Sequence, residues 1–207
     1  MMKWLKERNR QTHAFICGDF QSTLWMCAVA FGILIVIGLV IGFVKPSFAQ
    51  DYVDRFAQQL EDMGIQLEDG SISASMLFSN NVQAAFAAVI YGFIPFFKLP
   101  VLALGTNAIM LGAFAAYYLH NGISLVLYLA SLIPHGIFEI PAIIYAIALG
   151  IYLCEQVNTR LRTKKKGLVR KAWFNISRVL VFRVIPLLLI ASLVEAYVTP
   201  VIAGLFA

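Results

Sequence analysis

The sequence predicts an all-α integral membrane protein with about five transmembrane helices. Of its 207 residues, 60% are hydrophobic and only 13% are charged, and the mean hydropathy is +0.80. A soluble domain is about 45–50% apolar, so these proportions exclude a soluble protein of this size. At about 20 residues per span, the chain has room for about five spans and their connections. We therefore expect a single polytopic membrane domain over residues 1–207.

Residues 22–44 form the first predicted span. No charged side chain lies between Asp19 and Lys45, and the interval has about the length of one helix that crosses a bilayer. Residues 1–21 precede it as an arm outside the bilayer. Gly38 and Gly42 form a pair of small residues four apart, which lets helices approach closely. We favour packing within the chain for this pair, with a homodimer contact as the alternative.

Residues 45–80 predict an acidic segment outside the membrane, because they hold six acids and only two basic residues. The acids are Asp51, Asp54, Glu61, Asp62, Glu68 and Asp69. Within residues 48–63, aromatic or aliphatic side chains recur every four positions with acids between them, which predicts an amphipathic helix. Anionic lipid would repel its acidic face, so we expect it to pack on the protein's own outer surface, with packing on a partner as the alternative. Ser79–Asn81 then offer a side-chain cap for the next helix.

Three further apolar runs predict spans at residues 81–97, 99–119 and 179–206. Prolines and Lys98 between the first two runs predict a tight turn at the membrane surface. Gly105 and Gly112 flank Asn107 and predict a flat face on the 99–119 helix. We expect that face to receive the helix described next.

Residues 123–154 form an apolar run that is too long for one untilted span. At 1.5 Å per residue it would reach about 48 Å, against a hydrocarbon core of about 30 Å. We expect the fourth helix to be broken at Pro134–Gly136, because proline removes a backbone donor and glycine leaves the backbone soft. Pro141 and Pro200 are two further predicted break points.

The distribution of charge predicts the orientation. Four basic residues precede the first span, and eight lie between Arg160 and Arg178. Lys and Arg accumulate on the cytoplasmic side. We therefore expect the N-terminus and the basic loop at 155–178 to be cytoplasmic, and five crossings then leave the C-terminus extracytoplasmic. The alternative splits residues 123–154 into two spans, but these would be short and would place the basic loop outside.

A cluster of basic residues within that loop is expected to bind lipid headgroups. The residues are Lys164, Lys165, Lys166, Arg170 and Lys171. Trp173 and Phe174 follow them, and aromatic side chains favour the membrane interface. Each basic residue near an anionic surface contributes up to about 1 kcal/mol. Membrane lipids are thus an expected partner, and the segment requires no nucleic acid to explain it.

Three ionisable residues interrupt the apolar runs and are the best candidates for a functional site: His135, Glu139 and Glu195. Such a side chain at bilayer depth costs about 2.5–3.5 kcal/mol and persists mainly where it has a partner or a role. His135 and Glu139 are four positions apart and share one helix face. Counted from the cytoplasmic helix ends, Glu139 lies about 22 Å up its helix and Glu195 about 18 Å up its own. The sequence therefore predicts a buried polar cluster of these three side chains.

Three interpretations of that cluster remain open. In the first, the cluster is purely structural and supplies hydrogen bonds to polar groups at a helix break. In the second, it is a proton or ion site of a transporter, and in the third it is the metal site of a hydrolase. The last is the weakest, because His135 is the only one of three histidines clearly within the membrane and H-E-x-x-H is absent from the sequence. We expect no catalytic residue, no metal and no cofactor.

Four blocks of the sequence resemble signature blocks of the stage II sporulation protein M family. They run from about residue 80 to residue 200 and comprise Asn80-Asn81, Leu104-Gly-Thr-Asn107 to Gly112, Pro134-His-Gly-Ile-Phe-Glu-Ile-Pro-Ala142 and Glu195-Ala-Tyr-Val-Thr-Pro200. The third and fourth blocks occur together and in order, which makes the resemblance fairly specific. The His-Gly and Phe-Glu pairs are typical of a broad branch of the family. Asn80, Asn81 and Asn107 are the polar residues we expect to support the cluster.

The resemblance implies a multi-spanning protein of the inner membrane. In endospore formers the name-giving member works with the peptidoglycan-degrading sporulation proteins D and P, and is thought to hold these hydrolases in place without enzymatic activity. We accordingly expect a noncatalytic scaffold for cell-envelope remodelling in a bacterial or archaeal cell membrane. Cell-wall hydrolases or other envelope proteins are its expected partners. The alternative is a small permease or ion-coupled transporter that uses the buried cluster.

Overall fold

The computed structural model describes residues 2–65 and 72–206, and these residues form helices joined by turns, with no sheet among them. The all-α class is therefore confirmed. Glu68 and Asp69 of the predicted acidic segment lie outside the described residues. In chain order the helices are α1 (Met2–Ile16), α2 (Gln21–Val44), α3 (Pro46–Asp62), α4 (Ala74–Ile90), α5 (Pro100–His120), α6 (Leu125–Thr163), α7 (Leu168–Val179), α8 (Ile185–Tyr197) and α9 (Thr199–Gly204). A 3-10 turn, Tyr91–Phe93, extends α4, and a π-helical turn, Leu180–Val184, joins α7 to α8.

Four helical stretches of the described chain are long and apolar enough to cross a membrane. They are α2, α5, α6 and the stretch Leu168–Gly204 that runs from α7 through α9. These four stretches support the prediction that the chain is a membrane protein. Helix α4 has 17 residues and is not among them, so a fifth crossing stays a prediction.

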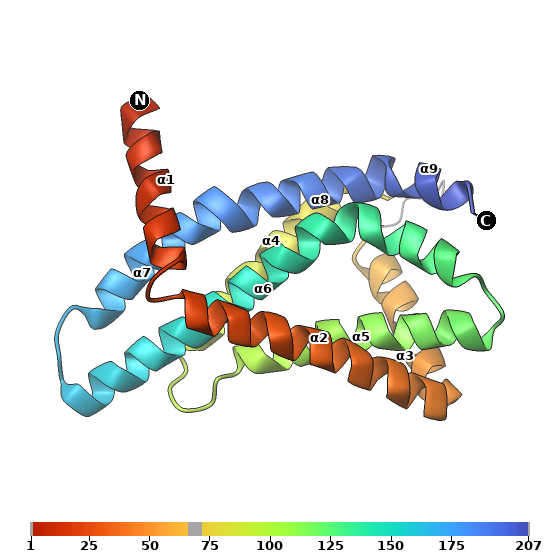
Figure 1. Cartoon of the computed structure of the whole chain (residues 1–207), viewed down its shortest axis with the longest axis horizontal. Helices are drawn as coiled ribbons and strands as arrows, with labels where there is room; N and C mark the ends of the chain where they lie inside the picture. Colours follow the sequence, from red (N-terminus) through yellow and green to blue (C-terminus); the bar gives the residue numbers. More distant parts are fainter. Residues whose placement is uncertain (1, 66–71, 207) are drawn as a thin grey trace.

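Helix α6 is the centre of the bundle. It contacts α2, α4, α5, α7, α8 and α9, and every residue from Ala146 to Cys154 is buried. Figure 1 shows α6 crossing the molecule diagonally, with α2 and α5 side by side below it and α8 above. A helix surrounded in this way is apolar on all faces, which explains why the apolar run of α6 is so long.

The predicted break of the fourth helix at Pro134–Gly136 is wrong. Pro134, Gly136 and Pro141 all lie inside α6, which stays helical over 39 residues. Figure 1 shows that α6 bends between its N-terminal third and the remainder. A proline removes one backbone hydrogen bond and kinks a helix without necessarily ending it. Helix α6 also continues past the apolar run to Thr163, and Arg160 and Arg162 are exposed there.

Two other boundaries differ from the prediction. Helix α4 begins at Ala74, seven residues before 81, because the Ser73 hydroxyl rather than Ser79–Asn81 caps it by accepting from the Met76 backbone N–H. The segment 155–178 is mostly helical as well. Helix α6 continues to Thr163 and α7 begins at Leu168, which leaves only the short turn 164–167 between them.

Helices α2 and α5 pack backbone against backbone at a pair of glycines. A Cβ atom added to Gly38 would overlap the carbonyl of Ile109, and one added to Gly112 would overlap the carbonyl of Ile35. A Cβ on Gly42 would lie 2.8 Å from the Cβ of Ala116. The Gly38–Gly42 pair thus packs within the chain, as we favoured.

The expectation that the glycine face of α5 receives the fourth helix is wrong. Gly112 meets α2, and nothing lies within 4 Å of a Cβ built on Gly105. Helix α6 is instead approached closely by the end of α4. A Cβ on Gly92 would overlap the carbonyl of Gly150, and one on Gly150 would overlap the carbonyl of Ala88.

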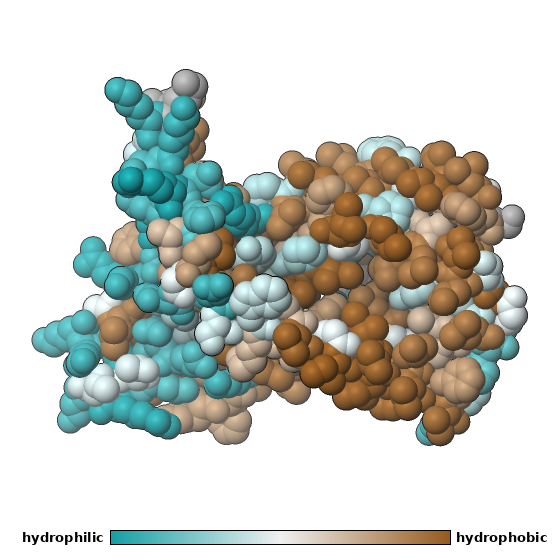
Figure 2. Space-filling view, viewed as in Figure 1, coloured by the Kyte–Doolittle hydropathy of each residue, from teal (hydrophilic) through white to brown (hydrophobic). Residues whose placement is uncertain are grey.

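The surface divides into a polar end and an apolar band. Figure 2 shows hydrophilic residues gathered over α1, α7 and the turn between α6 and α7, and hydrophobic residues over α2 and the α8–α9 region. Many large apolar side chains of α2 are exposed, including Trp25, Val29, Val36 and Phe43. An exposed apolar surface of this extent fits a lipid environment.

Replacing Gly112 by Ala should destabilise the protein, whereas the same change at Gly105 should not. The added methyl at Gly112 forces the α2 and α5 backbones apart, and such overpacking costs about 1–3 kcal/mol. At Gly105 the methyl meets open space and improves helix propensity by up to about 1 kcal/mol. Thermal unfolding of the detergent-purified variants measures the difference. Equal midpoints for the two variants would contradict the backbone contact.

Candidate functional site

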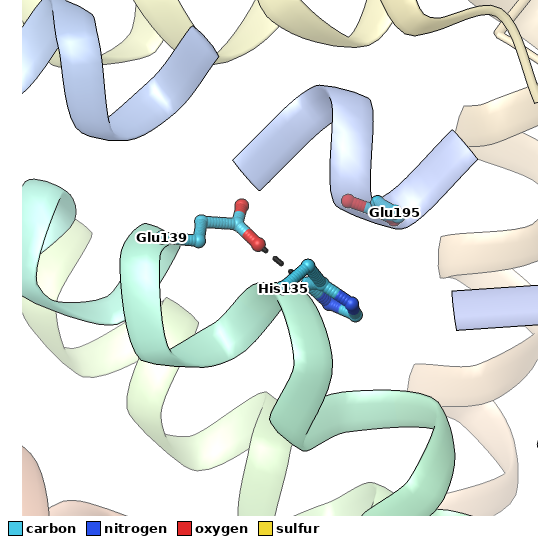
Figure 3. A group of neighbouring side chains, drawn as sticks. All are labelled: His135, Glu139 and Glu195. Carbon is cyan, nitrogen blue, oxygen red and sulfur yellow. Dashed lines mark ion pairs between the residues drawn. The ribbon is translucent and has the colours of Figure 1, made fainter. Parts of the chain in front are cut away.

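The structure brings His135, Glu139 and Glu195 together in one cluster. One ligand atom from each side chain lies within 4.8 Å of the other two. His135 and Glu139 come from successive turns of α6, and Glu195 comes from α8. Figure 3 shows the carboxylates of Glu139 and Glu195 extending toward each other across the gap between the two helices. His135 is 9% exposed, and the two acids are partly buried.

Two neighbouring helices contribute hydrogen bonds to this cluster. The Asn81 side-chain amide of α4 donates to Oε1 of Glu139 over 3.2 Å. Nδ1 of His135 lies 3.2 Å from the Thr199 hydroxyl of α9, and Nε2 lies 3.8 Å from Oε2 of Glu139. The cluster therefore connects four helices.

Local features of the chain position these groups. His135 and Glu139 share a face of α6 because they are four residues apart. Glu195 and Thr199 are also four residues apart, but α8 ends at Tyr197 and α9 begins at Thr199. Pro200 lies in the first turn of α9, where its missing N–H costs no helical hydrogen bond. The interruption before Pro200 thus separates the Glu195 helix from the short helix that reaches His135.

A cavity of about 290 Å³ adjoins the cluster. All three predicted supporting residues, Asn80, Asn81 and Asn107, line it together with the cluster itself. On the side of α3 it is lined by Gln59, Leu60, Met63 and the following Ile65. Asn107 also donates to the Ala103 carbonyl over 2.8 Å. Polar groups from α3, α4, α5, α6 and α8 therefore face one space.

The electrostatic balance of the cluster is unusual, because acceptors outnumber donors. In the described part of the chain, no Lys or Arg lies within ion-pairing distance of Glu139 or Glu195. Glu195 has no hydrogen-bond partner among the described residues. Two carboxylates held this close in a low dielectric require neutralisation by protons or by a cation. The arrangement is therefore suited to holding positive charge.

A model of the stage II sporulation protein M family matches residues 23–200, which include most of the chain. The chain belongs to the stage II sporulation protein M family. No curated protein and no solved structure matches it. The cluster, the three asparagines and the residues that line the cavity all lie within the matched residues 23–200.

The predicted lipid-binding residues of this family member lie apart from the cluster, at the polar end. Lys164, Lys165 and Lys166 are exposed in the turn between α6 and α7. Arg170 and Lys171 of α7 line a groove of about 770 Å³ between α1 and α7, together with Arg8 and the aromatic side chains of Trp4 and Phe174. Binding of lipid headgroups there stays a prediction.

Thr199, which contacts His135 of the cluster, is a site residue that the sequence analysis did not predict. It lies in the Glu195–Pro200 block, four residues after Glu195. That spacing is the signal that could have drawn attention to it, because two polar groups at i and i+4 face the same way along a helix. The identity of its partner, His135, depends on how α6 bends and could not be read from spacing.

Proposed function

We propose that this protein of the stage II sporulation protein M family is a noncatalytic membrane scaffold for cell-envelope remodelling in a bacterial or archaeal cell membrane. The observation that carries the proposal is the acidic outer face of α3, which we define as Asp51, Asp54, Glu61 and Asp62. All four side chains are exposed. A partner that presents a basic surface would be complementary to this face.

Helix α3 is held firmly enough to serve as a docking element. Its opposite side packs on α5, where the Phe56 ring meets the Phe114 ring edge to face at 5.3 Å. Ala49 of α3 is buried. Because the apolar side is occupied by the protein itself, the acidic face is left for a partner. Family membership favours a cell-wall hydrolase or another envelope protein in that role.

The proposed topology has five crossings, with α4 and its 3-10 turn as the second. The turn after α4 lies at the polar end, because Lys98 pairs with Glu155 over 2.9 Å and the Phe96 N–H donates to Asn158 over 3.0 Å. At the other end, Nε2 of His120 lies 2.9 Å from the Phe43 carbonyl. Helix α4 thus starts after α3 and finishes beside the basic end of α6. The positive-inside rule then makes the polar end cytoplasmic and the acidic face of α3 extracytoplasmic.

A second candidate function is ion-coupled transport through the His135 cluster. The observation that favours it is the cavity of about 290 Å³ beside the cluster, because transporters bind their coupling ions at interrupted helices in the bilayer. Helix α8 is interrupted at Val198, next to the cluster.

Neutralising the acidic outer face of α3 should weaken binding of the partner protein. In the variant D51N/D54N/E61Q/D62N, the amount of envelope protein that copurifies from native membranes should fall at least about tenfold, which corresponds to about 1.4 kcal/mol of lost binding. Mass spectrometry identifies the partner and quantifies it. Asp19→Asn is the matched control, because Asp19 is also exposed but lies at the polar end. Failure of the wild-type protein to retain any cell-wall hydrolase or other envelope protein would contradict the scaffold.

The native cysteines test the orientation. Cys17 is exposed, whereas Cys27 and Cys154 are buried, so a membrane-impermeant maleimide should react with Cys17 only. In right-side-out membrane vesicles, Cys17 should stay unmodified until the membrane is opened by detergent. A cysteine placed at the exposed position Gln58 of α3, in a Cys17→Ala background, should react without detergent. Immediate labelling of Cys17 in sealed vesicles would reverse the proposed topology.

Transport is tested by replacing both cluster acids with glutamine. If the second candidate function holds, pyranine-loaded proteoliposomes under an imposed potential should show proton flux with the wild type. The E139Q/E195Q variant should then lose that flux at least about tenfold, because a relay needs titratable groups. Glu155→Gln, on the same helix but outside the cluster, is the control. Flux that is unchanged in the double variant, or absent from the wild type, would exclude proton-coupled transport.

A further inference from the structure

We propose that His135, Glu139 and Glu195 bind one divalent transition-metal cation between α6 and α8. The proposal reverses the sequence-based expectation of no metal, which rested on His135 being a lone histidine. It does not rest on the scaffold function, because it concerns a different part of the molecule from the acidic outer face of α3.

The geometry of the three side chains fits a metal site. Three atoms that are at most 4.8 Å apart lie within about 2.8 Å of a common centre, since 4.8 divided by the square root of three is about 2.8. Zn²⁺ binds histidine nitrogen at about 2.0–2.1 Å and carboxylate oxygen at about 2.0–2.2 Å. Each ligand atom therefore has to move by less than about 1 Å, which small side-chain rotations provide.

The groups around the ligands fit the outer shell of a metal site. A ligating histidine normally donates its second ring N–H to an oxygen, and a ligating carboxylate is itself hydrogen-bonded. Here Nδ1 of His135 faces the Thr199 hydroxyl at 3.2 Å, so the tautomer that donates to Thr199 leaves a free lone pair on Nε2, which lies 3.8 Å from Oε2 of Glu139. Oε1 of Glu139 accepts from Asn81, which leaves Oε2 on the side of His135.

Charge balance supports the same conclusion. Two ionised carboxylates and a neutral imidazole carry two negative charges, and a divalent cation brings the cluster to zero. A neutral cluster avoids the large cost of unpaired charge at low dielectric. No Lys or Arg side chain of the described residues lies at ion-pairing distance to supply this compensation.

The donor set indicates which cations fit. Imidazole nitrogen suits Zn²⁺ and Fe²⁺, and carboxylates also accept Mn²⁺, whereas Ca²⁺ and Mg²⁺ prefer all-oxygen sites. The cavity of about 290 Å³ beside the cluster has room for water in the remaining coordination positions. The cavity wall on α3 also belongs to the helix that carries the acidic outer face, whose charges raise the local concentration of cations.

Metal content of the purified protein is the test. The full chain, with any affinity tag removed, is stripped with a chelator in detergent and then titrated separately with Zn²⁺ and Mn²⁺. Inductively coupled plasma mass spectrometry after desalting should find one equivalent of at least one of the two metals per chain. The thermal midpoint of the wild type should rise with that metal.

Variants of the two acids distinguish a cluster neutralised by a metal ion from one neutralised by protons. Glutamine resembles a protonated glutamate in shape, so E139Q/E195Q keeps a proton-neutralised cluster intact but removes two anionic ligands. Its metal affinity should fall at least about tenfold, and Asn81→Ala, which removes an outer-shell hydrogen bond, should weaken binding by about 10–100-fold. Glu155→Gln should bind as the wild type does.

Two results would overturn the proposal. One is wild-type protein that holds neither metal stoichiometrically and shows no metal-dependent thermal shift. The other is a double glutamine variant that binds metal as tightly as the wild type, which would place the ion elsewhere. If the double variant does not purify in folded form, the wild-type measurement decides alone.

Discussion

Direct contact between helix backbones is the constraint on which the rest of this structure depends. Helices within a bilayer gain little from excluding lipid, so they associate through close packing and hydrogen bonds. Gly38 and Gly112 allow α2 to lie against α5, and Gly92 and Gly150 allow the end of α4 to lie against α6. These two contacts bring α2, α4 and α5 close around α6. The contact between α4 and α6 also brings Asn81 of α4 to Glu139 of α6, to which it donates a hydrogen bond.

The polar cluster depends on irregular helix geometry in two places. The bend in α6 turns its N-terminal third relative to the remainder (Figure 1), and the interruption at Val198 separates α8 from α9. Glu195 and Thr199 therefore reach the cluster from two short helices rather than from one straight one. Interrupted helices are tolerated in membranes where the freed polar groups face protein or water instead of lipid. A cavity lined by three asparagines provides such surroundings.

Much of this arrangement follows from the sequence, and the remainder depends on tertiary contacts. Residues 22–44 and 99–119 lie within one or two residues of α2 and α5, because a charge-free run between polar residues defines its own ends. The 1.5 Å rise per residue sufficed to predict that Glu139 and Glu195 have similar depths. The role of Gly150 could not be predicted, because a glycine in an apolar run gives no sign of which helix crosses it. Continuity of α6 through Pro134 could not be predicted either, since the cost of a proline depends on what its neighbours supply.

The cluster and α3 share the wall of one cavity. Gln59 and Leu60 of α3 face the cavity, while Glu61 and Asp62 of the same helix are exposed on its outer face. Suppose that a ligand binds the cluster more tightly when α3 is packed on α5. The ligand then stabilises the packing of α3, and by linkage the packing of α3 strengthens ligand binding by the same free energy. Asn81 and Thr199 add α4 and α9 to the set of helices that the cluster holds. A ligand bound at the cluster and a partner bound on the outer face of α3 can therefore favour the same seating of α3 over the cavity.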